Sequence, residues 1–482
     1  MVSVSPFRAL RPPAERAAAV GAPPYDVVDV EEARALAAGQ PDNFLHVTRP
    51  EIDLPAAAAE ATSADDAGAV ELAGAGEQDG SPDRRVHDLG RAALLDLVRR
   101  GSLVLEAAPA VWVYRLEREG RAQTGVAACF AVDDYDSGVI RTHEHTRPDK
   151  EADRVAHIDA LDAHDEPVLL LHRPDEDLRS LVDRLSRAVP HLEVLDPEGV
   201  RHVLWRCREP DVVAEVVRIF GGLEHLYVAD GHHRTAAASR VRRLRLERAW
   251  GSGGEPGPAG TAAGPAGTNT AAATASSIAG IDTSTAVPGG TAADAGGSRT
   301  DEADVFLAVA FPADELTVLP YYRLVRDLDG LAPADVLRRL EPEFAVTPSD
   351  HPVEPSEPHA YGLYLDGTWY ELRARPDAVE GGHPVEQLDV AVLQQYVLAP
   401  VFGIADPRTD PRLAFLGGVH GVAELQRRVD EGQAAVALTL RATTVEDLMA
   451  VSDAGEVMPP KSTWFEPKLR SGLLVHPLHP GD

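Results

Sequence analysis

The chain has 482 residues, of which 44% are hydrophobic, and a formal net charge of −31 at pH 7. This length and apolar content predict two or three globular domains, whereas the acidic charge argues against a protein that binds nucleic-acid backbones, which requires a basic surface. Because no apolar run approaches the length of a membrane span and residues 1–20 lack the apolar region of a signal peptide, we expect a cytoplasmic protein without membrane or nucleic-acid partners.

The predicted secondary structure mixes short strands, hairpins and helices. Strands are expected at 110–117, 124–135, 138–144, 167–173, 303–311 and 434–442, and helices at 148–164, 175–189, 210–220, 333–340 and 388–403. A hairpin is expected at 361–374, turning at Asp366-Gly367. Because hairpins are interleaved with helices, the pattern favours an α+β fold with mixed sheets and packed helices over a doubly wound parallel sheet.

Two segments of low complexity interrupt this pattern. Residues 56–82 are small and acidic, and residues 251–301 consist mainly of Gly, Ala, Thr, Ser and Pro. Such compositions cannot bury enough apolar surface to offset the entropy of ordering, so we predict two disordered inserts. The chain then divides into an N-terminal α+β domain (1–250), the second insert, and a C-terminal α+β region (302–482) that packs on the first domain.

The distribution of lysine marks two short stretches of the chain. The basic residues are nearly all arginine, and the only lysines are Lys150, Lys461 and Lys468. A chain with this bias is expected to keep lysine where a compact ammonium group is needed. The three lysines fall within 143–154 and 458–472, which makes these stretches candidate binding segments.

The stretch LYVADGHHRTAAASR, residues 226–240, predicts a strand, a tight turn at Gly231 and a helix. The N-terminus of a helix attracts anions through its unpaired N–H groups and its dipole. His232, His233 and Arg234 would add donors and positive charge there, although cations disfavour the helix itself. The conflict points to an anionic ligand such as phosphate. Asp230 either caps the helix, holds a metal or accepts a proton.

The stretch RTHEHTRPDKEADR, residues 141–154, is densely titratable. His143 and His145 are expected to share one face of a strand end, with Glu144 on the other. The zinc-protease motif HExxH is absent because position 147 is arginine. The two histidines with a distant carboxylate remain a possible metal site, and the charges at 149–154 can equally form a solvated, salt-bridged helix start.

The stretch MPPKSTWFEPKLRSGLL, residues 458–474, combines cations and aromatic rings without a helix or strand period. Lys461 and Lys468 could hold phosphate, and Trp464 or Phe465 could stack on a base. The alternative is a C-terminal segment whose aromatic rings dock in the core. A Walker A loop is excluded because its glycines are missing.

Seven stretches occur in order along the chain: FRALRP, APPYDVV, NFLHVTRPE, HEHTRPDKEADR, ADGHHR, LDVAVLQ and MPPKSTWFEPKLRSGL. Together they resemble the DUF1015 family of bacterial and archaeal proteins, whose name records no activity. The DGHHR element is also similar to a motif of free-serine kinases built on the ParB/sulfiredoxin-like fold, which phosphorylate L-serine with a nucleotide donor. This resemblance implies that part of the fold is ParB/sulfiredoxin-like and that residues 230–234 lie beside nucleotide phosphates.

The resulting hypothesis is a kinase that uses ATP or ADP and Mg²⁺ to phosphorylate a small hydroxylated metabolite, with free L-serine as the first candidate. The predicted catalytic residues are Glu144, Asp230, His232 and His233, of which Glu144 and Asp230 also serve as metal ligands. The predicted nucleotide- and phosphate-binding residues are Gly231, Arg234, Arg147, Lys150, Lys461, Ser462, Trp464 and Lys468, and the predicted substrate-binding residues are Tyr25, Asp26 and His46. The alternatives are a ParB-like nucleotide-binding regulator without rapid turnover, or a metal-dependent hydrolase using His143, His145, His233 and Asp230. An oligomer is possible in each case.

Overall fold

The computed structural model describes residues 1–54, 84–251, 302–376, 379 and 383–479. The predicted disordered inserts, 56–82 and 251–301, lie outside these residues except for Gly251, which ends a helix. Within the described residues, no helix is both long enough and apolar enough to cross a membrane.

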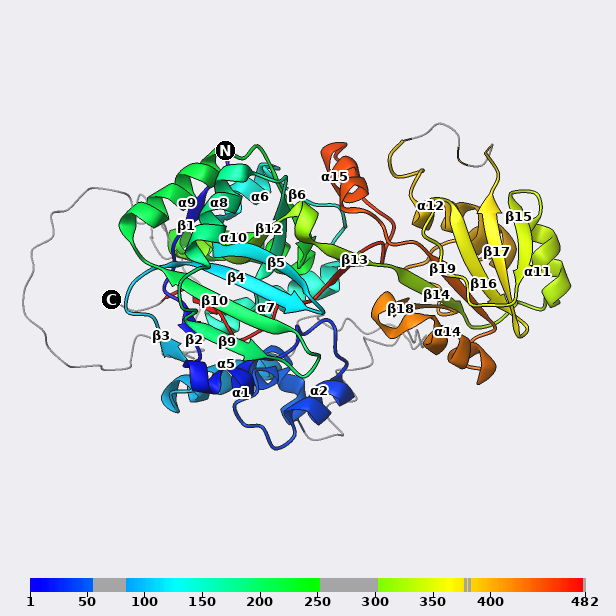
Figure 1. The fold of residues 1–482 in the computed structure, drawn as a ribbon. Helices are drawn as coiled ribbons and strands as arrows, with labels where there is room; N and C mark the ends of the chain where they lie inside the picture. The colour runs from blue at the N-terminus through cyan, green and yellow to red at the C-terminus, as the bar shows by residue number, and fades with distance from the viewer. Residues whose placement is uncertain (55–83, 252–301, 377–378, 380–382, 480–482) are drawn as a thin grey trace, which may run out of the picture.

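A mixed sheet of nine strands forms the larger part of the molecule (Figure 1). Its strands are β1 (Val4–Ser5), β4 (Val111–Arg118), β5 (Arg121–Ala131), β6 (Ile140–Arg141), β8 (Val168–His172), β9 (Leu192–Leu195), β10 (Arg201–Cys207), β11 (Leu226–Asp230) and β12 (Val305–Pro312). They run in the order β6-β11-β8-β12-β5-β4-β10-β9, with β1 also paired to β5. The pairs β6–β11 and β8–β12 are parallel, and the others are antiparallel. The predicted α+β class, with mixed sheets and packed helices, is confirmed.

The large sheet is buried on both faces. Along β4, Val111 and Val113 belong to one apolar core and Trp112 and Tyr114 to another, as the two-residue period of a strand requires. The first core is completed by the apolar faces of α8 (Glu176–Leu185) and α9 (Pro210–Gly222). Strands of this sheet therefore have apolar residues at successive positions, because both faces of the sheet are packed against other elements.

Further helices pack around the large sheet and include the helices that carry the two His-rich motifs. These helices are α1 (Ala17–Val20), α2 (Val30–Ala37), α3 (Leu45–Thr48), α5 (Arg84–Arg99), α6 (Val132–Asp136), α7 (Pro148–Leu161) and α10 (His232–Gly251). Helix α7 contacts both α5 and α10. Leu45, Leu94, Leu97 and Leu161 form the apolar core of the α3–α5–α7 part.

A second sheet of six antiparallel strands lies beside the first (Figure 1). Its order is β15 (Phe344–Ser349), β17 (Thr368–Ala374), β16 (Ala360–Leu365), β19 (Val436–Leu440), β14 (Tyr321–Val325) and β18 (Leu413–Gly417). Its helices are α11 (Pro333–Leu340), α12 (Asp389–Leu393), a π-helical turn (Gln394–Leu398), α13 (Ala399–Phe402) and α14 (Gly421–Asp430). The predicted hairpin turns at Asp366-Gly367, where both residues have positive φ, as a type I′ turn requires.

The remaining elements are short. They comprise β2 (Leu10–Arg11), β3 (Val104–Leu105), β7 (Ala163–His164), β13 (Thr317–Leu319), β20 (Trp464–Glu466), β21 (His476–Pro477) and α15 (Val445–Asp453). The 3₁₀ helices are Ala14–Arg16, Pro50–Asp53, Glu302–Asp304, Ala313–Glu315 and Gly418–His420.

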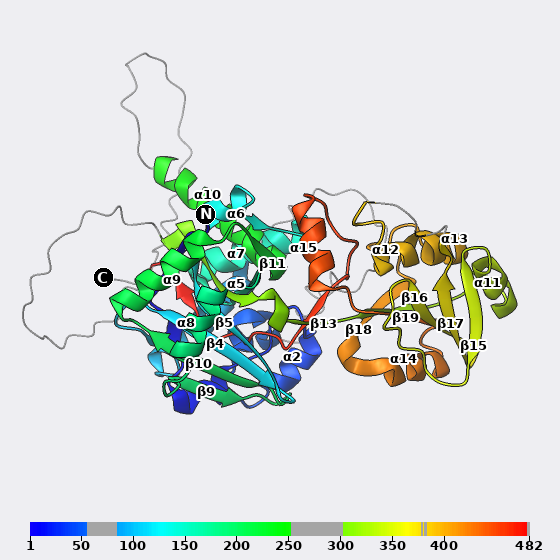
Figure 2. The same ribbon diagram turned by 45° about the horizontal axis from the view of Figure 1, so that its top comes forward.

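The C-terminal segment runs from the second sheet back to the first. Strand β20 pairs with β13, which lies in the connection between the two sheets (Figure 1), and β21 pairs with β7. Helix α15 lies between the sheets in both views (Figure 1, Figure 2), and its Asp453 accepts a hydrogen bond from Tyr227 of β11 at 2.7 Å. The domain boundary at residue 302 stays a prediction. Strands β12 and β21, which follow this boundary in the sequence, pair with the N-terminal strands β5 and β7.

Candidate functional site

The DGHHR turn, residues 230–234, joins the end of β11 to the start of α10. Gly231 has φ +95°, a conformation that other residues rarely adopt. A Cβ atom at this position would also lie 3.0 Å from Nε of Arg234. Glycine is therefore needed both for the turn and for the arginine side chain that folds back over it.

Arg234 is buried against oxygen atoms of three other residues. It donates to the Pro167 carbonyl at 2.5 Å and to Oδ2 of Asp230 at 3.4 Å, and Oδ2 of Asp26 lies 3.8 Å away. Burial works to lower the pKa of Arg234, but the carboxylates of Asp26, Glu166 and Asp230 outweigh it and raise the pKa above its ordinary value. The guanidinium is a fixed positive charge at the start of α10.

Asp230 carries a negative charge that cations from two parts of the chain stabilise. Its Oδ2 lies 3.4 Å from Nζ of Lys468, which arrives on the C-terminal segment. Burial alone would raise the pKa of Asp230, but Lys468 and Arg234 hold it well below its usual range. A carboxylate held in this state is a weak proton acceptor and is better suited to binding a cation than to acting as a general base.

The predicted strand at 138–144 is wrong beyond Arg141. Strand β6 pairs with β11 only at Ile140 and Arg141, after which the chain leaves the sheet. His143 is buried, whereas His145 is exposed, so the two histidines do not share a face. A strand of two paired residues cannot impose alternation on the residues that follow it.

His143, Glu144 and His232 instead form a cluster. Their candidate ligand atoms all lie within 4.8 Å of one another. The rings of His143 and His232 meet edge to face, with centroids 4.5 Å apart, and Oε2 of Glu144 is 4.0 Å from Nδ1 of His232. The expectation that Glu144 faces away from its neighbouring histidine is therefore wrong.

Burial disfavours the charged form of the three histidines at the start of α10. Burial, together with the neighbouring His232, lowers the pKa of His143 to about 3. Burial also lowers the pKa of His232 to about 4 and holds that of His233 below its ordinary value. The prediction that His232 and His233 add positive charge to the turn is wrong, because desolvation disfavours the imidazolium form. Nε2 of His233 accepts the backbone N–H of Arg147 at 3.0 Å.

The C-terminal loop, residues 458–468, brings a third motif to the same place. Thr463 Oγ1 lies 3.4 Å from Nε2 of His143, and the N–H of Met458 donates to the carbonyl of His143 at 2.8 Å. Nζ of Lys468 lies 5.2 Å from the centre of the Trp464 ring. Three stretches that are distant in sequence thus meet at the start of α10.

The aromatic rings of the loop pack with a tyrosine of the second sheet. Trp464 meets Tyr321 edge to face at 5.1 Å, and Nζ of Lys461 lies 5.3 Å from the Tyr321 ring centre. Phe465 is buried, so the alternative of core docking holds for that residue but not for the half-buried Trp464. Ser462 is also buried and donates to the Pro459 carbonyl at 2.6 Å.

The N-terminal candidates are only partly brought together. Tyr25 is buried beneath Arg154, whose guanidinium carbon lies 4.1 Å from the ring centre, and Asp26 approaches Arg234 as described above. His46 of α3 pairs instead with Asp53, at the end of the following 3₁₀ helix, at 2.9 Å.

The two cations predicted near the start of α7 are placed differently. The Arg147 side chain is exposed and pairs with Asp149 at 2.7 Å, so only its backbone contacts the site, through His233. Lys150 is half-buried in the first turn of α7.

Sequence reasoning missed Glu166 and Tyr321. Glu166 accepts hydrogen bonds from the Tyr25 N–H at 2.9 Å and from the Ser471 hydroxyl at 2.5 Å, and lines a small cavity with Arg234. Burial raises the pKa of Glu166 to about 7. The sequence signal was the acidic pair Asp165-Glu166, which only Pro167 separates from the apolar strand β8.

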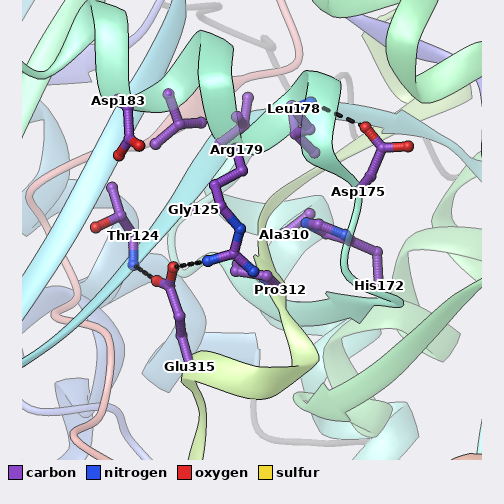
Figure 3. A pocket seen from close by; sticks show the side chains of 12 residues that line it. Thr124, Gly125, His172, Asp175, Leu178, Arg179, Asp183, Ala310, Pro312 and Glu315 are labelled. Atoms are coloured by element: carbon purple, nitrogen blue, oxygen red, sulfur yellow. Dashed lines mark hydrogen bonds and ion pairs between the residues drawn. The ribbon is translucent and has the colours of Figure 1, made fainter.

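A separate pocket lies between β5, α8 and the end of β12 (Figure 3). Arg179 and Glu315 point toward each other across it at 3.3 Å, and Glu315 also accepts the Thr124 N–H at 2.7 Å. None of the predicted site residues lines this pocket. Because Arg179 and Glu315 already pair with each other in this pocket, we place the candidate site at the start of α10.

The family model described as "Protein of unknown function (DUF1015)" matches residues 4–70, 56–261 and 273–391. The chain belongs to this family. The resemblance inferred from the seven sequence stretches is confirmed, and membership assigns no activity because none is recorded in the family's description.

Three solved structures show a distant likeness to this chain. A conserved hypothetical protein from Pyrococcus furiosus has 14% identity and a TM-score of 0.32, covering 73% of this chain and 95% of its own. A free serine kinase in complex with AMP has 13% identity and a TM-score of 0.30, covering 71% and 86%. C-terminally truncated SbnI from Staphylococcus aureus has 12% identity and a TM-score of 0.32, covering 74% and 90%. Likeness of this size assigns no ligand to this chain, and no curated protein matches it.

Proposed function

We propose that this protein binds a nucleotide between the DGHHR turn and the C-terminal loop and transfers a phosphoryl group to the hydroxyl of a small metabolite, with free L-serine as the first candidate. The observation that carries the proposal is the convergence of three stretches: Lys468 reaches Asp230, and Thr463 reaches His143, which packs against His232.

Arg234 and Lys468 are suited to bind phosphate. Both cations lie within 3.4 Å of Asp230, at a helix N-terminus whose N–H groups favour anions. Phosphoryl transfer is catalysed mainly by positioning and charge stabilisation. Because its carbonyl and carboxylate neighbours already hold Arg234, little reorganisation is needed when phosphate binds.

Trp464 and Tyr321 offer aromatic surface for a nucleobase. The Trp464 ring has a lysine ammonium 5.2 Å from its centre, and the Tyr321 ring has one at 5.3 Å. If the base of a nucleotide stacks on one ring, the phosphates of that nucleotide lie within reach of the same lysines. One segment, 461–468, would then contact both ends of a nucleotide.

Glu144 is the proposed proton acceptor for the substrate hydroxyl. Its side chain is 40% exposed, so a substrate can reach it, and it lies beside His232 in the first turn of α10. Asp230 and Glu144 provide the oxygen ligands that Mg²⁺ prefers, and Mg²⁺ would supply neutralisation of phosphate charge. Tyr25 and Asp26, next to Arg234, are the proposed substrate-side residues, and His233 the proposed phosphate contact.

The proposal is tested by incubating the protein with ATP or ADP, Mg²⁺ and a panel of hydroxy-amino acids, and detecting products by mass spectrometry. We expect phosphoserine from the wild type and from Arg179→Ala, which removes an ion-paired arginine in the separate pocket, but not from Arg234→Ala or Lys468→Ala. Thermal melting checks that each variant folds. Nucleotide binding without transfer to any acceptor would overturn the kinase in favour of a regulator, and absence of nucleotide binding would overturn both.

A further inference from the structure

The cluster of His143, Glu144 and His232 has the composition of a metal centre. It offers two imidazoles and one carboxylate whose candidate ligand atoms lie within 4.8 Å of one another. Two histidines and one carboxylate, with positions left open, form a recurrent binding set for divalent transition metals. Within the described residues, this is the group of His, Cys, Asp and Glu side chains that meets the spacing of a metal site.

The burial of His232 gives a second, independent indication. This side chain is 7% exposed, and its Nε2 atom has no hydrogen-bond partner among the described residues. A buried nitrogen without a partner is costly, and such groups in native proteins often mark a ligand or ion. Nδ1 of the same ring lies 4.0 Å from Oε2 of Glu144, so neither ring nitrogen is within hydrogen-bond distance of a partner among the described residues.

The surroundings of the cluster resemble the support that metal-bound histidines receive. The main-chain carbonyl of His143 accepts the N–H of Met458, and its Nε2 lies near Thr463 Oγ1, so the C-terminal loop fixes this residue. Such contacts orient a histidine for ligation. Glu144 lies on an irregular, half-exposed segment, so its carboxylate can move closer to the two imidazoles. Around one ion with bonds of about 2.0–2.1 Å, the ligand atoms are expected to lie roughly 3.3 Å apart.

We propose that His143, Glu144 and His232 hold one transition-metal ion, of the class of Mn²⁺, Fe²⁺ or Zn²⁺. Nitrogen ligands suit these ions, whereas Mg²⁺ prefers an all-oxygen shell. This ligand set shares Glu144 with the roles proposed above and differs from a Mg²⁺ site in its two imidazoles, so it is the state of the site before a nucleotide binds. The exposed side of Glu144 leaves coordination positions for water or an anionic ligand. This inference goes beyond the proposed function and requires no nucleotide.

The test uses the untagged full-length protein, stripped with a chelator and titrated with Co²⁺ while visible absorption is recorded. We expect one Co²⁺ per chain, with ligand-field bands that Zn²⁺ abolishes and a large excess of Mg²⁺ does not. Glu144→Gln keeps the shape of a half-exposed side chain and should lower the affinity for Co²⁺ at least tenfold. His232→Ala should abolish the ligand-field bands. His145→Ala removes the exposed neighbouring histidine and should bind as the wild type does.

Unchanged Co²⁺ affinity in Glu144→Gln and His232→Ala, equal competition by Mg²⁺, or no bound Co²⁺ would overturn the metal site. Nucleotide binding, measured in parallel on the stripped protein with Mg²⁺, separates this failure from failure of the proposed function. Retained nucleotide binding without Co²⁺ binding would reject only the metal site, and the converse would reject only the nucleotide site.

Discussion

The DGHHR turn and the C-terminal loop both bring cations to the start of α10, but they hold them differently. Arg234 of the turn is 8% exposed and surrounded by the Pro167 carbonyl and by carboxylates. Lys461 of the loop is exposed and contacts the ring of Tyr321. Lys468 is intermediate, since it is 17% exposed and lies near both Asp230 and Trp464.

This difference separates a fixed part of the site from an adjustable one. Removing one member of a buried ion pair typically costs about 3–5 kcal/mol, whereas an exposed pair contributes about 0–1 kcal/mol and an exposed cation–π contact about 0.5–1 kcal/mol. The turn is thus built into the core, and the loop is held weakly at Lys461. The chain is anchored just after the loop, where Arg470 pairs with Asp196 at 2.7 Å.

The largest effect is expected when the fixed part is broken. Arg234→Ala leaves Asp26, Glu166 and Asp230 close together without their shared cation, so we expect the free energy of unfolding to fall by about 3–5 kcal/mol. Urea denaturation measures this loss. A loss below 1 kcal/mol would mean that the turn is held no more firmly than the loop.

A pH-dependent effect is expected at Glu166. Burial raises its pKa to about 7, so between about pH 4.5 and 7 the folded state binds more protons than the unfolded state, and wild-type stability falls as pH rises. Glu166→Gln keeps the acceptor for Tyr25 and Ser471 but removes this titration. Between pH 4.5 and 7.5, we expect the free energy of unfolding of the variant to rise by about 2–3 kcal/mol relative to that of the wild type. A pH-independent difference between the two unfolding curves would contradict the raised pKa.

A smaller effect is expected at Gly231. Alanine at this position would have to adopt φ +95°, and its Cβ would lie 3.0 Å from Nε of Arg234. We expect the free energy of unfolding to fall by about 1–2 kcal/mol. Gly120→Ala is the matched control, because it also has positive φ but meets nothing within 4 Å. Thermal melts should show a greater loss at Gly231, and equal losses would show that the packing of Arg234 is irrelevant.

The smallest effect on stability is expected in the adjustable part. Lys461→Ala removes an exposed cation–π contact, so the free energy of unfolding should change by less than about 1 kcal/mol. Nucleotide affinity, measured by calorimetry, should fall several-fold. A stability loss as large as that of Arg234→Ala would show that the loop is as fixed as the turn.

Local sequence signals predicted much of the fold. The Asp366-Gly367 hairpin, the strands β4 and β8 and the helix after Gly231 follow from turn chemistry and apolar periodicity. The strand through 138–144 was wrong because pairing with β11 ends after two residues, which no local pattern reveals.

The sequence predicted the parts of the candidate site but not how they meet. The DGHHR turn and the C-terminal loop were identified from residue types that conflict with their local surroundings, such as cations at a helix start. Glu166 and Tyr321 were missed because their importance comes from distant contacts, to Tyr25 and Trp464 respectively. The charge of His232 was mispredicted because burial, which only the fold supplies, decides it.

The most direct test of the central idea, that the turn and the loop form one nucleotide site, is a calorimetric titration of ADP into three proteins. These are the wild type, Lys468→Ala and Arg427→Ala, the last an exposed arginine of α14 paired with Glu424. We predict one ADP per chain, with a dissociation constant at least tenfold higher in Lys468→Ala and unchanged in Arg427→Ala. Equal affinity in all three proteins, or no binding by the wild type, would contradict the account.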